Sequence, residues 1–184
     1  MSHGCKIDKQ EAAYFLTLTI TDWQYVFKED RFKNILVDGL NFCVEKKGLE
    51  IFSYVIMSTH MHLIARSKNE DLSFVIGGFK KFSAIKILNI LRKENPNSIY
   101  LYKFSEAATK HSRNENFQFW KYGNHPEEVY SPKFTLSKIK YIHNNPVDAG
   151  MVARPENYYY SSAYDYAGKK GPVKVSLLSL HNLY

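Results

Sequence analysis

The chain has 184 residues, of which 45% are hydrophobic and 15% aromatic, and its 25 Lys and Arg against 18 Asp and Glu give a net charge of +7. This length and composition favour one compact domain over residues 1–184 and exclude a disordered chain. No apolar run approaches the roughly 18 residues that a membrane span needs, and the N-terminus lacks a signal-peptide pattern, so we expect a cytoplasmic protein with no membrane partner. The two cysteines, Cys5 and Cys43, exclude a disulfide framework and a cysteine-rich zinc site.

The positive charge is unevenly distributed along the chain. The first 50 residues carry slightly more acidic than basic side chains, so the whole excess lies after residue 50, and it is densest in residues 51–100. Such a concentration indicates a polyanionic partner such as nucleic acid, because Lys and Arg side chains neutralise phosphates and release their counterions. Ordinary solubilising charge produces the same composition, so charge alone leaves both interpretations open.

The hydrophobic pattern predicts the elements of the first half of the chain. Residues 13–21 are rich in aromatic and β-branched side chains and predict a strand, and residues 30–47 have the spacing of a helix. Residues 50–57 form an apolar run typical of a strand covered on both faces, and residues 60–65 predict a second strand after a short break. A long helix is expected over residues 72–93.

The second half is less regular. Residues 97–130 are expected to be irregular, with a strand near residues 117–121. A further helix is expected over residues 131–145, with Ser131 as its N-cap, ending at Pro146. The order strand, helix, strand, strand, helix, strand, helix predicts an α+β fold: a ferredoxin-like sandwich, with an antiparallel central sheet and helices packed on one face.

Two histidines stand out in the second apolar segment, at His60 and His62 with Met61 between them. Side chains two residues apart on a strand point to the same face, so both imidazoles would project together. A pair placed in this way can hold a divalent metal if a third ligand comes from elsewhere. A His-x-His pair also occurs by chance in many proteins, and a zinc hydrolase would use the same pair, so the motif alone decides nothing.

The helix expected over residues 131–145 offers the missing partner. Its spacing places Tyr141 and Asn145 on a polar side together with Lys138, while Ile139 and Ile142 mark the apolar side. An amide oxygen at Asn145 suits a hard metal such as Mg²⁺ or Mn²⁺. A tyrosine that only anchors the helix to the core would produce the same spacing.

Taken together, these segments resemble a known family. His60-Met61-His62, preceded by the apolar stretch SYVIMST, resembles the HUH motif of single-tyrosine transposases. The stretches FW, KYGNHPEEVYS and KIKYIHNNPVDAGMV resemble the C-terminal half of the REP-associated tyrosine transposases. The likeness covers most of residues 13–165, and residues from about 168 to 184 form an extension that matches nothing in that family. The family's helix carries Tyr-Ile-x-x-Asn-Pro-Val-x-x-Gly, and the matching positions are Tyr141, Ile142, Asn145, Pro146, Val147 and Gly150.

The resemblance implies a ferredoxin-like fold and metal-dependent cleavage and rejoining of single-stranded or hairpin DNA through a covalent 5′-phosphotyrosine. Carried over to this chain, Tyr141 is the nucleophile, His60 and His62 bind Mg²⁺ or Mn²⁺, and Asn145 occupies the position of the third ligand. Relatives act as monomers or as homodimers, and the resemblance allows both states here. Two segments depart from the family pattern and affect which DNA hairpin is recognised: residues 58–59 are Ser-Thr where relatives often have Pro-Asn, and residues 12–14 stand where many carry a Gly-containing motif.

Several basic and aromatic residues are candidates for DNA binding, and two alternative functions remain. One alternative is a domesticated protein that binds a DNA hairpin without transposition, and the other is a metal-dependent hydrolase that uses the histidine pair to activate water. Unpaired bases stack on exposed aromatic rings, and phosphates attract Lys and Arg. The candidate DNA-binding residues are Arg66, Lys68, Lys80, Lys81, Trp120 and Lys138.

Overall fold

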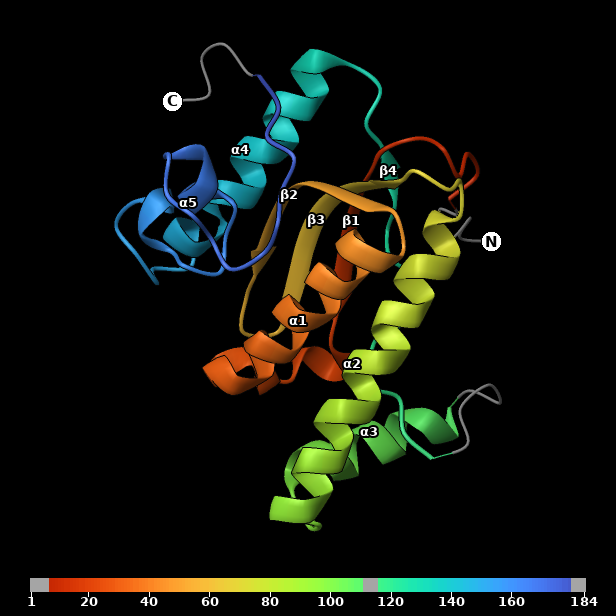
Figure 1. Cartoon of the computed structure of the whole chain (residues 1–184). Coiled ribbons are helices and arrows are strands. Elements are labelled where there is room, and N and C mark those ends of the chain that lie inside the picture. Colours follow the sequence, from red (N-terminus) through yellow and green to blue (C-terminus); the bar gives the residue numbers. More distant parts are fainter. Residues whose placement is uncertain (1–6, 111–115, 180–184) are drawn as a thin grey trace.

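The computed structural model describes residues 7–110 and 116–179, and at its centre is a four-stranded antiparallel sheet with the strand order β2-β3-β1-β4. This order, with a helix between β1 and β2 and another after β3, is the ferredoxin-like arrangement, so the expected fold class is confirmed (Figure 1). The strands are β1 (Tyr14–Thr19), β2 (Leu49–Ile56), β3 (His60–Ser67) and β4 (Glu127–Glu128), and the helices are α1 (Asp30–Lys46), α2 (Leu72–Glu94), α3 (Ile99–Thr109), α4 (Pro132–Asp148) and α5 (Ala163–Tyr166).

Helices cover both faces of the sheet. Helices α1 and α2 lie side by side on one face, as expected, and the buried side chains of Met61 and Leu63 on β3 belong to the core (Figure 1). Helix α4 lies on the opposite face, where it contacts β2 and β3. The expectation that the helices pack on one face therefore holds for α1 and α2 and is corrected for α4. Because the side chains of a strand alternate between its two faces, one set of side chains on β3 faces α1 and α2 and the other set faces α4.

Residues 97–130 differ most from the expectation. They contain α3, which begins after Ser98, whose side chain accepts a hydrogen bond from the Leu101 backbone N–H. The expected strand near residues 117–121 is wrong, because this segment makes only an isolated antiparallel bridge between Ile20 and Trp120. The fourth strand comes later, at Glu127–Glu128, where it pairs with the start of β1.

Helix α4 continues past the proline that was expected to end it. Pro146 lies within the last turn, where it removes only one backbone hydrogen bond of the helix. The chain leaves the helix at Gly150, whose positive φ of 67° is costly for residues with a side chain. The longer helix keeps Asn145 in helical register with Tyr141, one turn away.

The C-terminal part of the chain closes the outer edge of β2. The backbone N–H of Ser162 donates to the Tyr54 carbonyl, and the Ile56 N–H donates to the Tyr160 carbonyl. Further along, the Ser176 N–H donates to the Ile51 carbonyl. The described part of the predicted C-terminal extension, residues 168–179, is thus attached to the sheet, whereas residues 180–184 and Cys5 lie outside the described residues. Within the described ranges, no helix has the length and hydrophobicity to cross a membrane.

A buried polar cluster holds α4 against β2. His143 Nε2 lies 2.9 Å from Ser162 Oγ and 3.2 Å from Ser53 Oγ. Ser162 Oγ also accepts a hydrogen bond of 3.0 Å from the Tyr54 backbone N–H. All three clustered side chains are almost fully buried, so each depends on the others to satisfy its hydrogen-bonding groups.

We expect Ser162→Ala to lower the free energy of unfolding by about 1–3 kcal/mol, because it removes one hydrogen-bonding partner of the buried His143 and the side-chain acceptor of the buried Tyr54 N–H. Urea denaturation followed by circular dichroism measures this change. Ser137→Ala is the matched control, since Ser137 is exposed on α4, and it should change the stability by no more than about 0.5 kcal/mol. Equal stabilities of the two variants would contradict a role for the cluster in holding α4.

Candidate active site

The two histidines of β3 face α4. Their ring centroids lie 4.8 Å apart, and His62 pairs in register with Thr17 of β1. Thr17 Oγ1 lies 2.9 Å from His62 Nδ1, and Thr59 Oγ1 lies 2.9 Å from His60 Nδ1. When each Nδ1 donates to its threonine, each Nε2 carries the lone pair that a metal ion requires. The contacts with the two threonines are therefore compatible with the metal-binding tautomer of both rings.

Both histidines are neutral at neutral pH. Burial lowers the pKa of His60, and a side-chain hydrogen-bonding interaction with Asn145 partly opposes this effect. Burial lowers the pKa of His62 to about 3, with smaller contributions from electrostatic interactions with His60 and Lys138. Neutral imidazole is the form that binds metals, so no proton has to be displaced from either ring at pH 7.

Tyr141 on α4 packs against the histidine pair of β3. Its ring centroid lies 5.2 Å from that of His62 and 5.9 Å from that of Phe15. The side chain is 48% exposed, and its ring packs against the rings of His62 and Phe15. The structure thus brings Tyr141 and the histidine pair together within one chain.

Asn145, one helical turn after Tyr141, lies beside His60, as their side-chain interaction shows. The chemistry of this donor set, two imidazole nitrogens and an amide oxygen, fits a divalent transition ion such as Mn²⁺ better than Mg²⁺, which prefers oxygen ligands alone. Across residues 7–110 and 116–179, no three His, Cys, Asp or Glu side chains cluster closely enough to bind a metal. Asn145, the polar side chain beside His60, is therefore the candidate for a third ligand among the described residues.

Lys138 lies at the border of this site. Its Nζ atom is 4.4 Å from the centroid of the Phe15 ring and 2.7 Å from the Glu127 carboxylate. Its positive charge reaches His62, whose pKa it lowers. Of the candidate DNA-binding residues, Lys138 is the one that the structure places beside the histidines and the tyrosine.

The other candidates are distributed over the molecule. Lys68 and Lys81 are exposed, and Arg66 forms an ion pair of 2.6 Å with Glu50 at the end of β3 remote from His60. Lys80 donates to the Lys121 carbonyl and to Asn124 Oδ1, and burial lowers its pKa to about 8. Lys80 therefore holds a loop of its own chain.

Trp120 is only 6% exposed, and its indole N–H donates to Ser83 Oγ over 3.1 Å. This burial removes Trp120 from the residues that could stack on a base, because a stacked base needs an open ring face. Trp120 was a candidate because unpaired bases stack on aromatic rings, but an isolated tryptophan carries no sequence signal that separates a core position from an exposed one.

Three residues of the site, Phe15, Thr17 and Thr59, are only weakly indicated by the sequence. Phe15 and Thr17 lie on the same face of β1 as the histidines on β3, since the two strands are in register. The Phe15 ring is stacked on His62 at a centroid distance of 5.3 Å. Strand alternation places both side chains on one face, but only the register brings Thr17 opposite His62 and Phe15 into contact with it. Thr59 precedes His60 directly and could have been found from that position alone.

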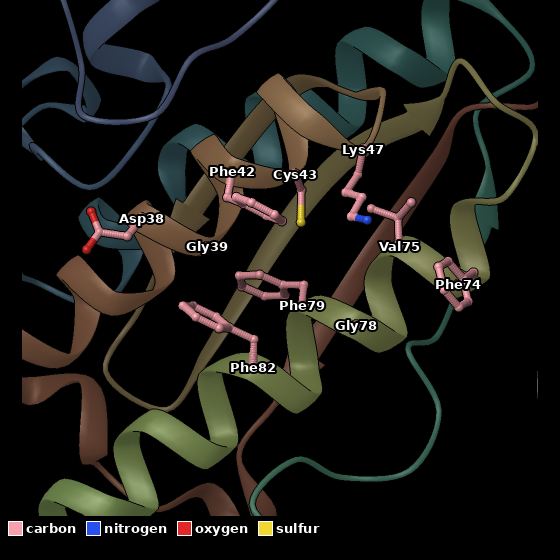
Figure 2. Close-up of a pocket in the computed structure, with 10 residues that line it drawn as sticks. All are labelled: Asp38, Gly39, Phe42, Cys43, Lys47, Phe74, Val75, Gly78, Phe79 and Phe82. Atoms are coloured by element: carbon pink, nitrogen blue, oxygen red, sulfur yellow. The ribbon is translucent and has the colours of Figure 1, made fainter.

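An apolar groove on the other side of the molecule has no part in this site. It has a volume of about 540 Å³, lies between α1 and α2, and is lined by Phe42, Cys43, Phe74, Phe79 and Phe82 among others (Figure 2). Burial raises the pKa of the Cys43 thiol to about 11, so this side chain is protonated and unreactive at neutral pH. The sheet separates this groove from the histidine pair.

The fold and the site together define a class: a ferredoxin-like α+β domain with a His-x-His pair on a central strand and a tyrosine on a helix that packs over it. The chain is similar in structure to a REP-associated tyrosine transposase bound to a REP hairpin, with a TM-score of 0.64 and 17% sequence identity. The match covers 99% of this chain and 98% of that chain. No family model and no curated protein matches the sequence. The likeness establishes that the two proteins share a fold.

Stability at acidic pH should report on the buried histidines. The pKa of His143 is lowered by burial to about 4 and that of His62 to about 3, so the unfolded chain binds more protons than the folded one below pH 6.5. We expect each of these groups to reduce the free energy of unfolding by about 1.4 kcal/mol per pH unit as the pH falls from 6.5 towards 4.5.

Urea denaturation at half-unit pH intervals, with a chelator present, measures this dependence. In His143→Asn the slope should be shallower by the contribution of one histidine, and above pH 7 neither His62 nor His143 should contribute to the slope. An unchanged slope in the variant would show that His143 does not titrate as a buried group.

Proposed function

We propose that this protein cleaves and rejoins single-stranded or hairpin DNA through a covalent bond to Tyr141, as a transposase-type enzyme. The observation that carries the proposal is the proximity of Tyr141 to His60 and His62 on one face of the sheet. The fold supports it, because the similar solved structure is that of a tyrosine transposase bound to a hairpin. The net charge of +7 supports a polyanionic partner.

In this proposal Tyr141 supplies the nucleophile. Its phenol oxygen attacks the scissile phosphorus, the oxygen–phosphorus bond forms, and the bond from phosphorus to the 3′ oxygen breaks. The phenol proton passes to solvent, to which the half-exposed side chain is open, and the departing 3′ oxygen takes up a proton. Because the phosphodiester energy is kept in the 5′-phosphotyrosine, a second 3′ hydroxyl reverses the step and joins strands without ATP.

His60, His62 and Asn145 would hold a divalent ion, for which Mn²⁺ is the best match and Mg²⁺ an alternative. When bound, the ion polarises the phosphate and neutralises the charge that develops on its oxygens. Thr17 and Thr59 keep the two imidazoles oriented by bonding their Nδ1 atoms. The packing of α4 on the sheet keeps Tyr141 beside them, so the nucleophile is positioned before DNA binds.

Lys138 adds a fixed positive charge at the border of the site. Its ammonium group is held by Glu127 and by the ring of Phe15, so it can meet a phosphate oxygen without a large loss of side-chain freedom. All of these groups belong to one chain, which favours a site that works within a monomer over one shared between two copies. A cytoplasmic location remains a prediction from the sequence.

We expect Tyr141→Phe to abolish the covalent protein–DNA adduct, because it removes the attacking oxygen and leaves the ring. The measurement is a denaturing gel of a labelled hairpin oligonucleotide with single-stranded flanks, incubated with the protein and Mn²⁺. Tyr159→Phe is the matched control, since Tyr159 is 49% exposed and lies outside the site, and it should form the adduct as the wild type does.

Cleavage that survives Tyr141→Phe would instead indicate a metal-dependent hydrolase that activates water. Binding of the hairpin without cleavage under any divalent metal would indicate a DNA-binding protein that has lost the reaction.

We expect Asn145→Ala to weaken Mn²⁺ binding at least about tenfold, as measured by isothermal titration calorimetry, because it removes the proposed oxygen ligand beside His60. Asn144→Ala is the control, because Asn144 is exposed on the same turn. Equal Mn²⁺ affinity in the two variants would exclude Asn145 as a ligand, and loss of binding in His60→Ala would still locate the ion at the histidine pair.

A further inference from the structure

An exposed tryptophan lies beside the histidine pair and has no part in the chemistry proposed above. Trp23 is 50% exposed, and the centroid of its ring lies 5.4 Å from that of His60, with the ring planes at 76°. The Lys121 ammonium group lies over the same ring, 5.2 Å from its centroid. Half of this large aromatic side chain is thus open to water beside the candidate catalytic site.

The backbone that carries Trp23 is strained. Asp22 and Trp23 both have a φ of 52°, in the left-handed region that a bulky side chain rarely adopts. Two such residues in succession cost free energy, and strained backbone of this kind is concentrated at functional sites. The strain is maintained by hydrogen bonds, because the Trp23 N–H donates to the Ile20 carbonyl and the Ile20 N–H donates to the Thr59 carbonyl.

This hydrogen bonding links the tryptophan to the histidine pair. Thr59 bonds both to Ile20, through its backbone, and to His60, through its side chain. On the other side, the Lys121 N–H donates to the Thr19 carbonyl, which fixes the lysine beside the turn. Trp23 is thus held in a set position relative to His60 and next to a cation.

We propose that Trp23 is a platform on which an unpaired base of single-stranded DNA stacks, directly next to the phosphate that lies at the histidine pair. This inference rests on the proposed function. A flat aromatic surface takes any base, because every base has a π face, and the neighbouring Lys121 supplies a positive charge for the backbone phosphate of the stacked nucleotide. Stacking there would fix the strand on one side of the scissile phosphate, opposite the approach of Tyr141.

The test measures binding of a fluorescein-labelled single-stranded oligonucleotide by anisotropy, in the Tyr141→Phe background so that the DNA stays intact. We expect Trp23→Ala to weaken binding about 5- to 100-fold, the range that corresponds to loss of one stacked base. Trp23→Tyr should stay within about threefold of the parent protein, because it keeps an aromatic face. Binding of fully paired duplex DNA should be equal in all three proteins.

Trp23→Gly separates the role in binding from a role in folding. Glycine tolerates the positive φ, so this variant should unfold at the same temperature as the parent or higher while binding single strands as weakly as Trp23→Ala. The control is Phe74→Ala, which removes an exposed aromatic ring from α2 on the other face of the sheet and should leave DNA binding unchanged. If Trp23→Ala fails to fold, the glycine and tyrosine variants still decide the question.

Intrinsic fluorescence gives a second readout on the unmodified protein. Of the two tryptophans in the chain, Trp120 is buried, so the DNA-sensitive emission should come from Trp23. Single-stranded DNA should quench this emission, and Trp23→Phe should remove the quenching while binding persists.

The outcomes distinguish this inference from the proposed function. An adduct at Tyr141 together with unchanged binding in Trp23→Ala and Trp23→Gly would overturn the platform alone. Quenching that depends on Trp23 without any adduct would support the platform and contradict the proposed reaction. Failure of the wild-type protein to bind any single-stranded DNA would overturn both.

Discussion

The alternation of side chains along β3 is the constraint on which the rest of the structure depends. One set of its side chains, which includes Met61 and Leu63, enters the core beneath α1 and α2, and the other set presents His60 and His62 to α4. A shift of one residue in register would place both imidazoles in the apolar core and leave the core without those two side chains. The packing of the core and the geometry of the candidate site are thus fixed by the same pairing of strands.

The position of α4 depends on a second, smaller set of interactions. The helix presents an apolar side with Ile139 and Ile142 to the sheet, and the hydrogen bonds of His143 fix where along β2 it rests. Apolar packing alone tolerates small shifts, whereas buried hydrogen bonds have narrow geometry. This cluster lies two residues from Tyr141, so the groups that stabilise the helix also position the proposed nucleophile.

The sequence predicted the parts of this structure that follow from local pattern, and it failed where tertiary contacts decide. The strands around His60 and the helix with Tyr141 have regular periodicity, and both were predicted. Helix α3 was missed because its apolar face is short and follows Pro96, which indicated a loop. Trp120 was a candidate for DNA binding but is buried, because its burial depends on distant contacts such as that with Ser83, which no local pattern encodes.

Both edges of the central sheet are protected in the described part of the chain. At one edge, the segment from Tyr160 to Ser176 bonds to the backbone of β2, and at the other, β4 is two residues long and carries two glutamates. Short, charged or covered edges prevent the addition of a further strand from another molecule. In the part of the chain that the structure describes, both edges of the sheet therefore disfavour pairing with a strand from a second copy of this protein.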